Sequence, residues 1–174
     1  MSPRRTSHAF TLVEVAIVTI VAGVLAASVV PAITQLDRAR RAAAADEIER
    51  MLVLARSTAT TTGEATGVEI DPIANTVALV RVDRDGGGVG PAMNPTGQPH
   101  EIVVLDSLFN GAALTTFVNG DGTSGMGVLW FSFNGTPQTR GASGADPLPF
   151  AEDAVVTLVG GQTVSVRMYS GLVE

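Results

Sequence analysis

Residues 10–30 read FTLVEVAIVTIVAGVLAASVV and contain one charged side chain, that of Glu14. As an α-helix, these 21 residues would extend about 31 Å, the thickness of the hydrocarbon core of a bilayer. The preceding residues, MSPRRTSHA, include Arg4 and Arg5 but no acid. A membrane-spanning helix and a secretory signal peptide cut near residues 26–28 both fit this pattern. Glu14 favours the membrane helix, because a carboxylate inside an apolar segment costs a few kcal/mol unless a specific counter-charge neutralises it.

The stretch His8-Ala9-Phe10-Thr11-Leu12-Val13-Glu14 resembles the class III leader of type IV prepilins and type II secretion pseudopilins. The resemblance implies that the prepilin peptidase, a membrane-embedded aspartyl peptidase, cuts between Ala9 and Phe10 and then methylates the amine of Phe10. It also implies that Glu14 acts in assembly and that Pro31 kinks the helix. The sequence departs from the family pattern at Ala9, where Gly is usual. Because Ala is the smallest replacement, we expect cleavage to be retained.

The physical basis of this motif is a charge pair. Cleavage would leave an α-ammonium group on Phe10, about one helical turn from Glu14. In a bundle of such helices, the amine of a neighbouring chain can neutralise the Glu14 carboxylate, and at low dielectric the pair depends strongly on geometry. We therefore expect Glu14 to set the axial register between subunits. The alternative is that Glu14 only extends to the membrane interface.

Residues 31–62 continue the helix with an amphipathic pattern. Apolar side chains recur at helical spacing, at Ile48, Met51, Leu52, Ala55 and Ala59. Gly63 predicts the end of the helix. The chain is therefore expected to comprise a leader (1–9), a transmembrane helix half (10–30), a soluble half of the same helix (31–62) and a β head domain (63–174).

The head is rich in turn residues and strand-like runs. Gly160-Gly161 predicts a tight hairpin, and the Gly- and Pro-rich residues 85–100 predict a mobile loop. Trp130, Phe131 and Phe133 are expected to pack in the sheet and core. Strands are expected at residues 67–71, 76–83, 101–106, 114–118, 128–133, 155–159 and 163–169. The expected fold class is α+β, with a long N-terminal α-helix, transmembrane in its first half, packed on an antiparallel β-sheet head.

Three short segments of the head region support a narrower resemblance. Residues 54–57 (LARS), residues 131–136 (FSFNGT) and the end of the chain, with Val164-Ser165-Val166 and residues 170–173 (SGLV), are similar to motifs of the GspH/FimT group of minor pseudopilins. Leu172 stands where that group frequently has Arg. The resemblance implies a pilin-like fold.

Side chains suited to catalysis or metal binding are scarce. The chain has no Cys and two His, which excludes thiolate chemistry and zinc–thiolate sites. Asn119, Asp121 and Thr123 place oxygen atoms at alternate positions, a weak calcium pattern that is also ordinary turn chemistry. His100 has no second ligand at metal-binding spacing and is expected to be a surface loop residue. We expect no enzymatic activity and no cofactor.

Charge argues against nucleic acid as a partner. All 11 basic residues are Arg, and residues 64–174 hold four Arg against 12 acidic residues. Phosphate binding requires clustered cations, so we expect no binding to nucleic acid.

The family resemblance implies a structural subunit, a minor pseudopilin of the type II secretion system pseudopilus that takes part in protein export across the outer membrane. Its implied partners are other pseudopilins or pilins through the N-terminal helix, the prepilin peptidase, the inner-membrane assembly platform and membrane lipid. The implied location is the bacterial inner membrane, crossed once, with the head in the periplasm and assembled into a periplasmic pseudopilus. Two alternatives remain open: a minor type IV pilin serving adhesion or DNA uptake, and a membrane-anchored periplasmic binding module.

Overall fold

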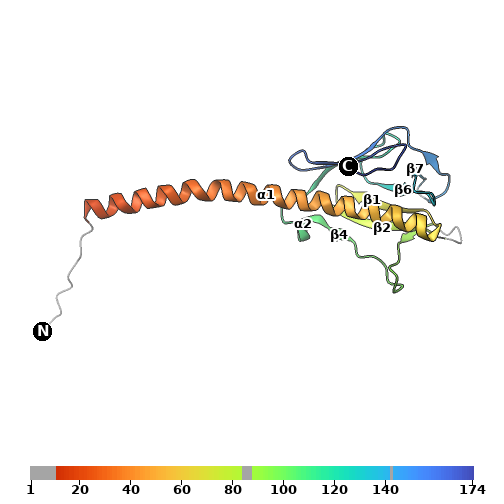
Figure 1. The fold of residues 1–174 in the computed structure, drawn as a ribbon, viewed down its shortest axis with the longest axis horizontal. Helices are drawn as coiled ribbons and strands as arrows, with labels where there is room; N and C mark the ends of the chain where they lie inside the picture. The colour runs from red at the N-terminus through yellow and green to blue at the C-terminus, as the bar shows by residue number, and fades with distance from the viewer. Residues whose placement is uncertain (1–10, 84–87, 142) are drawn as a thin grey trace. The chain divides into compact units, whose positions relative to one another are not determined.

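The protein is described from a computed structural model, which covers residues 11–83, 88–141 and 143–174. The chain divides into two compact units, Met1–Arg38 and Ala39–Glu174. Helix α1 (Leu12–Thr62) contributes to both units, and Gly63 follows it with a φ of 72°. All the β-strands belong to the second unit (Figure 1). The α+β fold class predicted from the sequence is confirmed.

The head contains two antiparallel sheets. The first sheet has the strand order β3-β2-β1-β6-β7-β8, with β4 beside β2, and the second has the order β10-β9-β5. The strands of the first sheet are β1 (Thr66–Asp71), β2 (Thr76–Val82), β3 (Val89–Pro91), β4 (Val103–Val104), β6 (Gly127–Phe131), β7 (Pro137–Thr139) and β8 (Leu148–Pro149). Those of the second are β5 (Leu114–Val118), β9 (Ala154–Leu158) and β10 (Thr163–Val166), and a short helix, α2 (Leu105–Leu108), follows β4.

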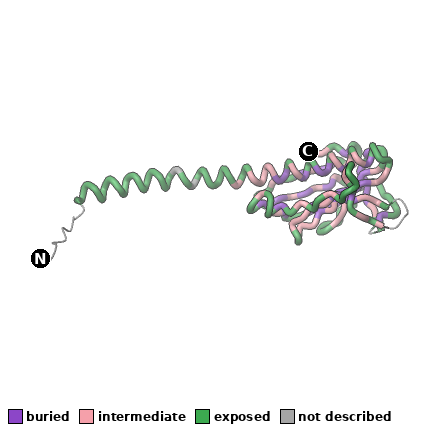
Figure 2. Tube along the Cα trace, turned by 90° about the horizontal axis from the view of Figure 1, so that it is seen from below, coloured by how far each residue is buried: buried purple, intermediate pink, exposed green. Residues whose placement is uncertain are grey.

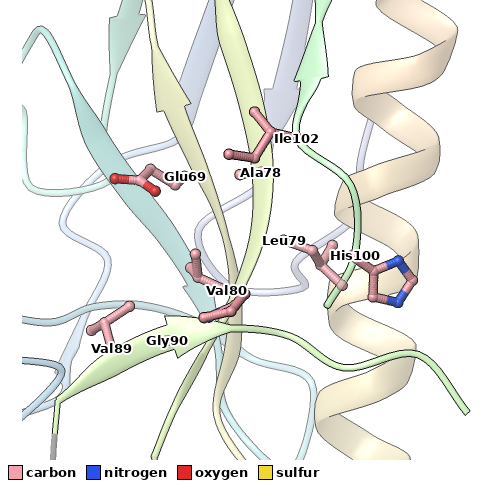
Figure 3. Close-up of a pocket in the computed structure, with 9 residues that line it drawn as sticks. Glu69, Ala78, Leu79, Val80, Val89, Gly90, His100 and Ile102 are labelled. Carbon is pink, nitrogen blue, oxygen red and sulfur yellow. The ribbon is translucent and has the colours of Figure 1, made fainter. Parts of the chain in front are cut away.

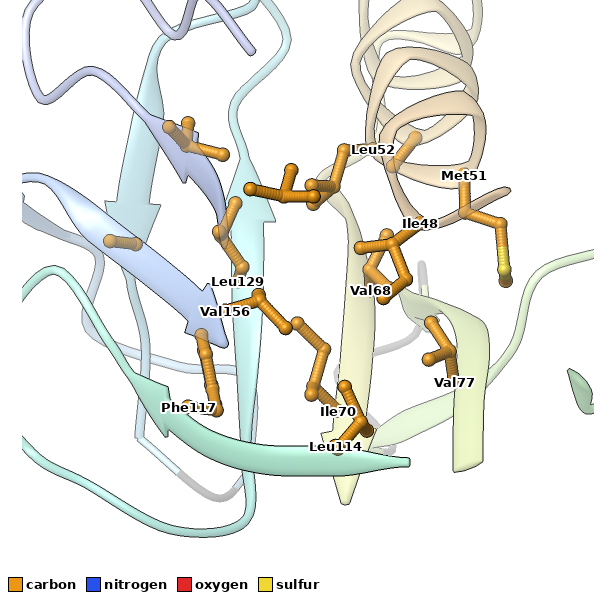
Figure 4. Close-up of a cluster of buried hydrophobic side chains, with 14 of the residues drawn as sticks. Ile48, Met51, Leu52, Val68, Ile70, Val77, Leu114, Phe117, Leu129 and Val156 are labelled. Carbon is orange, nitrogen blue, oxygen red and sulfur yellow. The ribbon is translucent and has the colours of Figure 1, made fainter. Parts of the chain in front are cut away.

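One face of the second part of α1 forms the centre of the core. Its buried side chains recur three or four residues apart, so they line a single stripe: Ala44, Ala45, Ile48, Met51, Leu52, Ala55 and Ala59. In Figure 4, Ile48 and Leu52 point toward Val68 and Leu129 of the first sheet, with Val156 of the second sheet beyond. Figure 2 shows that the buried residues lie in the second part of α1 and in the strands. The helix stripe and the inner faces of both sheets therefore share one core.

A polar clamp connects the two sheets. Asn75, in the turn between β1 and β2, takes a positive φ of 56°. Its side-chain amide donates to the Ala112 carbonyl (3.1 Å), and its Oδ1 accepts from the Leu114 N–H (2.9 Å). Leu114 begins β5 and Ala112 lies two residues before it, so this one side chain connects the first sheet to the edge of the second.

Strand β5 contains an irregularity that the sequence pattern did not reveal. Leu114 and Phe117 are both buried although they are three residues apart, whereas side chains on one face of a regular strand are two apart. The register against β9 shifts between Leu114 and Thr116. This bulge turns Phe117 back to the core side.

Other predictions for the head were partly wrong. Residues 89–91 form β3, and residues 93–100 form a hairpin closed by a bridge between Met93 and Pro99, where the sequence had predicted a mobile loop. The Asn94 side chain stabilises this hairpin by accepting from the Thr96 and Gln98 N–H groups, each at 3.0 Å. Strand β4 stops at Val104 because the chain then turns into α2.

The end of β6 also differs from the prediction. The strand ends at Phe131, and Phe133 lies in the following turn with 68% of its surface exposed, so Phe133 is not a core residue. Trp130 and Phe131 are buried as expected. The Gly160-Gly161 hairpin is confirmed, since both residues have positive φ between β9 and β10.

The core stripe leads to a first prediction. Leu52→Ala should lower the free energy of unfolding of the head by about 2–5 kcal/mol, because Leu52 is fully buried between the helix and the sheets. Val53→Ala provides the matched control. The Val53 side chain, next to Leu52 in the sequence, is 51% exposed, so its truncation should lower the free energy of unfolding by well under ~1 kcal/mol. Chemical denaturation followed by circular dichroism measures both. Equal losses for the two variants would contradict the placement of the stripe.

Candidate functional site

The first part of α1 presents an apolar surface that none of the described residues covers. Apolar side chains between residues 12 and 29 are at least half exposed: Leu12, Val13, Val15, Ile17, Val18, Ile20, Val21, Val24, Leu25 and Val29. By length and composition this helix qualifies as one candidate membrane span, and none of its most apolar window is buried. Exposed apolar surfaces of this size mark sites of contact with lipid or with other proteins.

Glu14 and Thr11 form a capping box at the start of α1. The Glu14 N–H donates to the Thr11 Oγ1 at 3.2 Å, and the Thr11 N–H is directed at the Glu14 Oε2 at 3.5 Å. This reciprocal pair satisfies two backbone donors that a helix N-terminus otherwise leaves free. Both residues are exposed. Glu14 therefore has a local role within the chain that the charge-pair argument from the sequence had not included.

The other sequence-predicted residues of this segment are less informative. Ala9 and Phe10, the predicted cleavage and methylation site, lie outside the described residues. Pro31 lies within α1, which continues through it. The Thr34 hydroxyl donates to the Pro31 carbonyl at 2.9 Å. The roles predicted for these residues stay predictions.

Three segments singled out in the sequence meet at one junction in the head. Arg56 on α1 donates through Nη1 to the Gly171 carbonyl at 3.1 Å. A Cβ atom on Gly135 would lie 3.2 Å from Arg56 Nε, and one on Gly171 would lie 3.0 Å from the Gly135 carbonyl oxygen. Both glycines also have positive φ, 80° and 62°. The guanidinium thus connects the helix, the β6–β7 turn and the C-terminal segment at a place where only Gly fits.

The C-terminal segment is held by β10 as well. Ser165 and Glu174 exchange two backbone hydrogen bonds, at 2.7 and 2.9 Å. Arg167 forms ion pairs with Asp153 (2.9 Å) and Glu174 (3.0 Å). Hydrogen bonds from the Met168 N–H and from Arg167 lower the pKa of Asp153. The segment therefore continues the second sheet beyond β10.

The side-chain oxygens of Asn119 and Asp121, which form the weak calcium pattern, accept hydrogen bonds within the turn. Asp121 Oδ1 accepts from the Thr123 hydroxyl (2.6 Å) and N–H (2.9 Å), and these bonds lower the pKa of Asp121. Asn119 donates to the Val128 carbonyl at 3.3 Å and accepts from the Gly120 N–H at 2.9 Å. Across the described part of the chain, no three His, Asp or Glu side chains group as metal ligands do. The structure therefore gives these residues a turn-forming role.

His100 lies beside a groove at the end of α1. The groove has a volume of about 640 Å³ and separates the last turns of the helix from residues 93–100. Ser57, Thr58 and Thr61 line the helix side, and Met93 and His100 line the other. Sequence reasoning missed the groove because it depends on the hairpin at residues 93–100. Glu64 and Arg81 also line the groove and form an ion pair with each other at 3.4 Å.

The fold is similar to that of two solved structures of the minor pseudopilin EpsH from the type 2 secretion system of Vibrio cholerae. One matches with a TM-score of 0.56 and 15% sequence identity, covering 78% of this chain and 94% of that chain. The other, a crystal structure, matches with a TM-score of 0.55 and 16% identity, covering 78% and 92%. The chain thus has a pilin-like fold with a long N-terminal helix. No protein-family model and no curated protein sequence matches it.

The junction at Arg56 gives the second prediction. Arg56→Ala should destabilise the head by about 1–3 kcal/mol, because it removes a hydrogen bond and the packing of the arginine stem on Gly135. Arg50→Ala is the matched control on the same helix, since Arg50 makes only an exposed i,i+3 ion pair with Glu47 and should cost less than ~1 kcal/mol. Thermal unfolding of both variants checks this, and an equal loss would show that the junction is not a specific contact.

Proposed function

We propose that the chain is a minor pseudopilin, a structural subunit of a type II secretion pseudopilus that takes part in protein export across the outer membrane. The observation that carries the proposal is the combination of an uncovered apolar helix surface with a head of the pilin-like fold that resembles EpsH. Proteins with this fold are typically structural rather than enzymatic. The GspH/FimT-like motifs support the same assignment, because all three meet at the Arg56 junction.

In this proposal the chain divides by environment. Residues 1–9 are the leader, 10–30 cross the inner membrane, 31–62 are the soluble half of the helix, and 63–174 form the periplasmic head. The prepilin peptidase cuts between Ala9 and Phe10 and methylates Phe10. The mature chain then passes through the inner-membrane assembly platform into a fibre with other pseudopilins, and the apolar helix surface exchanges lipid for neighbouring helices.

The capping box gives Glu14 two successive partners. Before assembly, the carboxylate accepts from its own helix N-terminus through the Thr11 N–H, which lowers the cost of placing it in a membrane. During assembly, the methylated amine of a neighbouring Phe10 offers a full positive charge at low dielectric. The exchange is favourable only when the two chains have the correct axial offset, so Glu14 acts as a register device.

Processing is the direct test of the proposed leader. The mature protein, isolated after co-expression with a prepilin peptidase, should begin with N-methylated Phe10, as seen by mass spectrometry of its N-terminal peptide. Ala9→Gly should be processed at least as well, while Ala9→Leu should stay uncut because the bulky side chain blocks the peptidase. A mature N-terminus near Ser28 would instead indicate signal peptidase cleavage and would remove the proposed function.

Glu14 allows a test of assembly. Glu14→Ala should leave membrane insertion intact, since it removes a carboxylate from an apolar segment, but should reduce the subunit in sheared fibres by at least about tenfold, which corresponds to the loss of a low-dielectric charge pair. Glu49→Ala, an exposed carboxylate on the head part of α1, is the control and should assemble normally. Immunoblots of membrane and fibre fractions give both quantities. Normal incorporation of Glu14→Ala would refute the register role.

A further inference from the structure

The face of the first sheet that points away from the core carries the carboxylate of Glu69. In β1, Val68 and Ile70 face the core, so Glu69 between them faces outward. Its neighbours across the sheet are Ala78 on β2 and Val128 on β6. Both cross-strand neighbours of Glu69 are therefore aliphatic. The other carboxylate that β1 places on this face, that of Asp71, accepts hydrogen bonds from the Ile73 and Ala74 N–H groups.

The surroundings of Glu69 form an open hollow of about 450 Å³. Figure 3 shows Glu69, Ala78, Val80 and Ile102 around this space, with Val89 on β3 at its lower side. Val89 and Ile102 are 38% and 60% exposed. His100, which also borders the hollow, lies toward α1 in the figure. The hollow is thus lined largely by apolar side chains, of which Val89 and Ile102 are exposed.

Glu69 makes no hydrogen bond or ion pair with any residue that the structure describes, although its side chain is only partly exposed. Other carboxylates of the head with partly buried side chains do have partners; those of Glu64 and Asp153 pair with Arg81 and Arg167. A half-buried charge without a partner loses hydration and gains nothing in return. A cation supplied from outside would give Glu69 the partner that it lacks among the described residues.

We infer that this hollow binds an extended segment of a partner protein that presents one Arg or Lys flanked by aliphatic side chains. Charge complementarity selects the cation, which would pair with Glu69. The aliphatic lining selects its neighbours: in an extended segment, residues two apart face the same surface, so positions on either side of the cation would cover the exposed Val89 and Ile102. An ion pair sealed from water by aliphatic contacts is the arrangement found at binding hot spots.

The location of the hollow favours a partner outside the fibre. The second part of α1 packs on the opposite face of this sheet, so helix contacts with other subunits leave the outer face free. In this respect alone the inference rests on the proposed function. The 12 acidic residues and four Arg of residues 64–174 would also attract a basic segment at long range.

Two short peptides test the inference on the full chain in detergent micelles. The first, acetyl-Val-Ser-Arg-Ser-Val-amide, presents the cation between two Val on one face, and the second has Glu in place of Arg. The wild type should bind the Arg peptide at least about tenfold more tightly than the Glu peptide in a fluorescence anisotropy titration. Glu69→Gln should remove this preference, and Glu69→Arg should reverse it.

The controls separate this site from general charge attraction and from fibre assembly. Glu152→Gln changes the net charge by the same amount through an exposed carboxylate and should keep the preference for the Arg peptide, while Ile102→Ser should weaken binding of the Arg peptide.

Equal binding of both peptides by the wild type would overturn the inference, as would an equal loss of the preference in Glu69→Gln and Glu152→Gln. So would self-association of the wild type in sedimentation that Glu69→Arg abolishes, because a second copy would then cover the face. Failed processing at Phe10 with intact peptide preference would refute the proposed function alone.

Discussion

The burial of one helix stripe against two sheets is the interaction on which the rest of the head depends. Small residues at Ala44, Ala55 and Ala59 let the helix approach the strands closely, and Ile48 and Leu52 fill the space between the sheets. Neither sheet has a second layer of its own on this side, so each needs the helix to cover its inner face. The earlier part of the same helix is apolar on all sides, and no described residue covers it. The later part is apolar on one side only, and that side packs in the head.

Polar contacts then define positions that the apolar core alone would leave open. Asn75 ties the β1–β2 turn to β5, and Arg56 ties α1 to Gly135 and Gly171. Each of these side chains joins segments far apart in the sequence. Their hydrogen bonds go to backbone carbonyls and N–H groups rather than to other side chains, so the geometry they impose is that of the main chain itself.

The sequence predicted the elements whose signals are local. The helical period around Ile48 and the Gly160-Gly161 turn required no knowledge of distant residues, and both matched the structure. Features set by distant partners were missed. The bulge in β5 turns Phe117 inward only because β9 lies beside it, and β6 ends before Phe133 to form the turn that Arg56 contacts. The hairpin at residues 93–100 follows Ala92, whose N–H donates to the Leu79 carbonyl of β2. The hollow at Glu69 required the sheet order.

The arrangement of the helix in the head has a mechanical consequence. A force applied along α1 at residue 39 would load the whole stripe from Ala44 to Ala59 in parallel, together with the Arg56–Gly171 contact. All these contacts would have to slip at once, whereas strands pulled apart from one end separate one hydrogen bond at a time. The head is therefore built to resist shear along the axis of its helix.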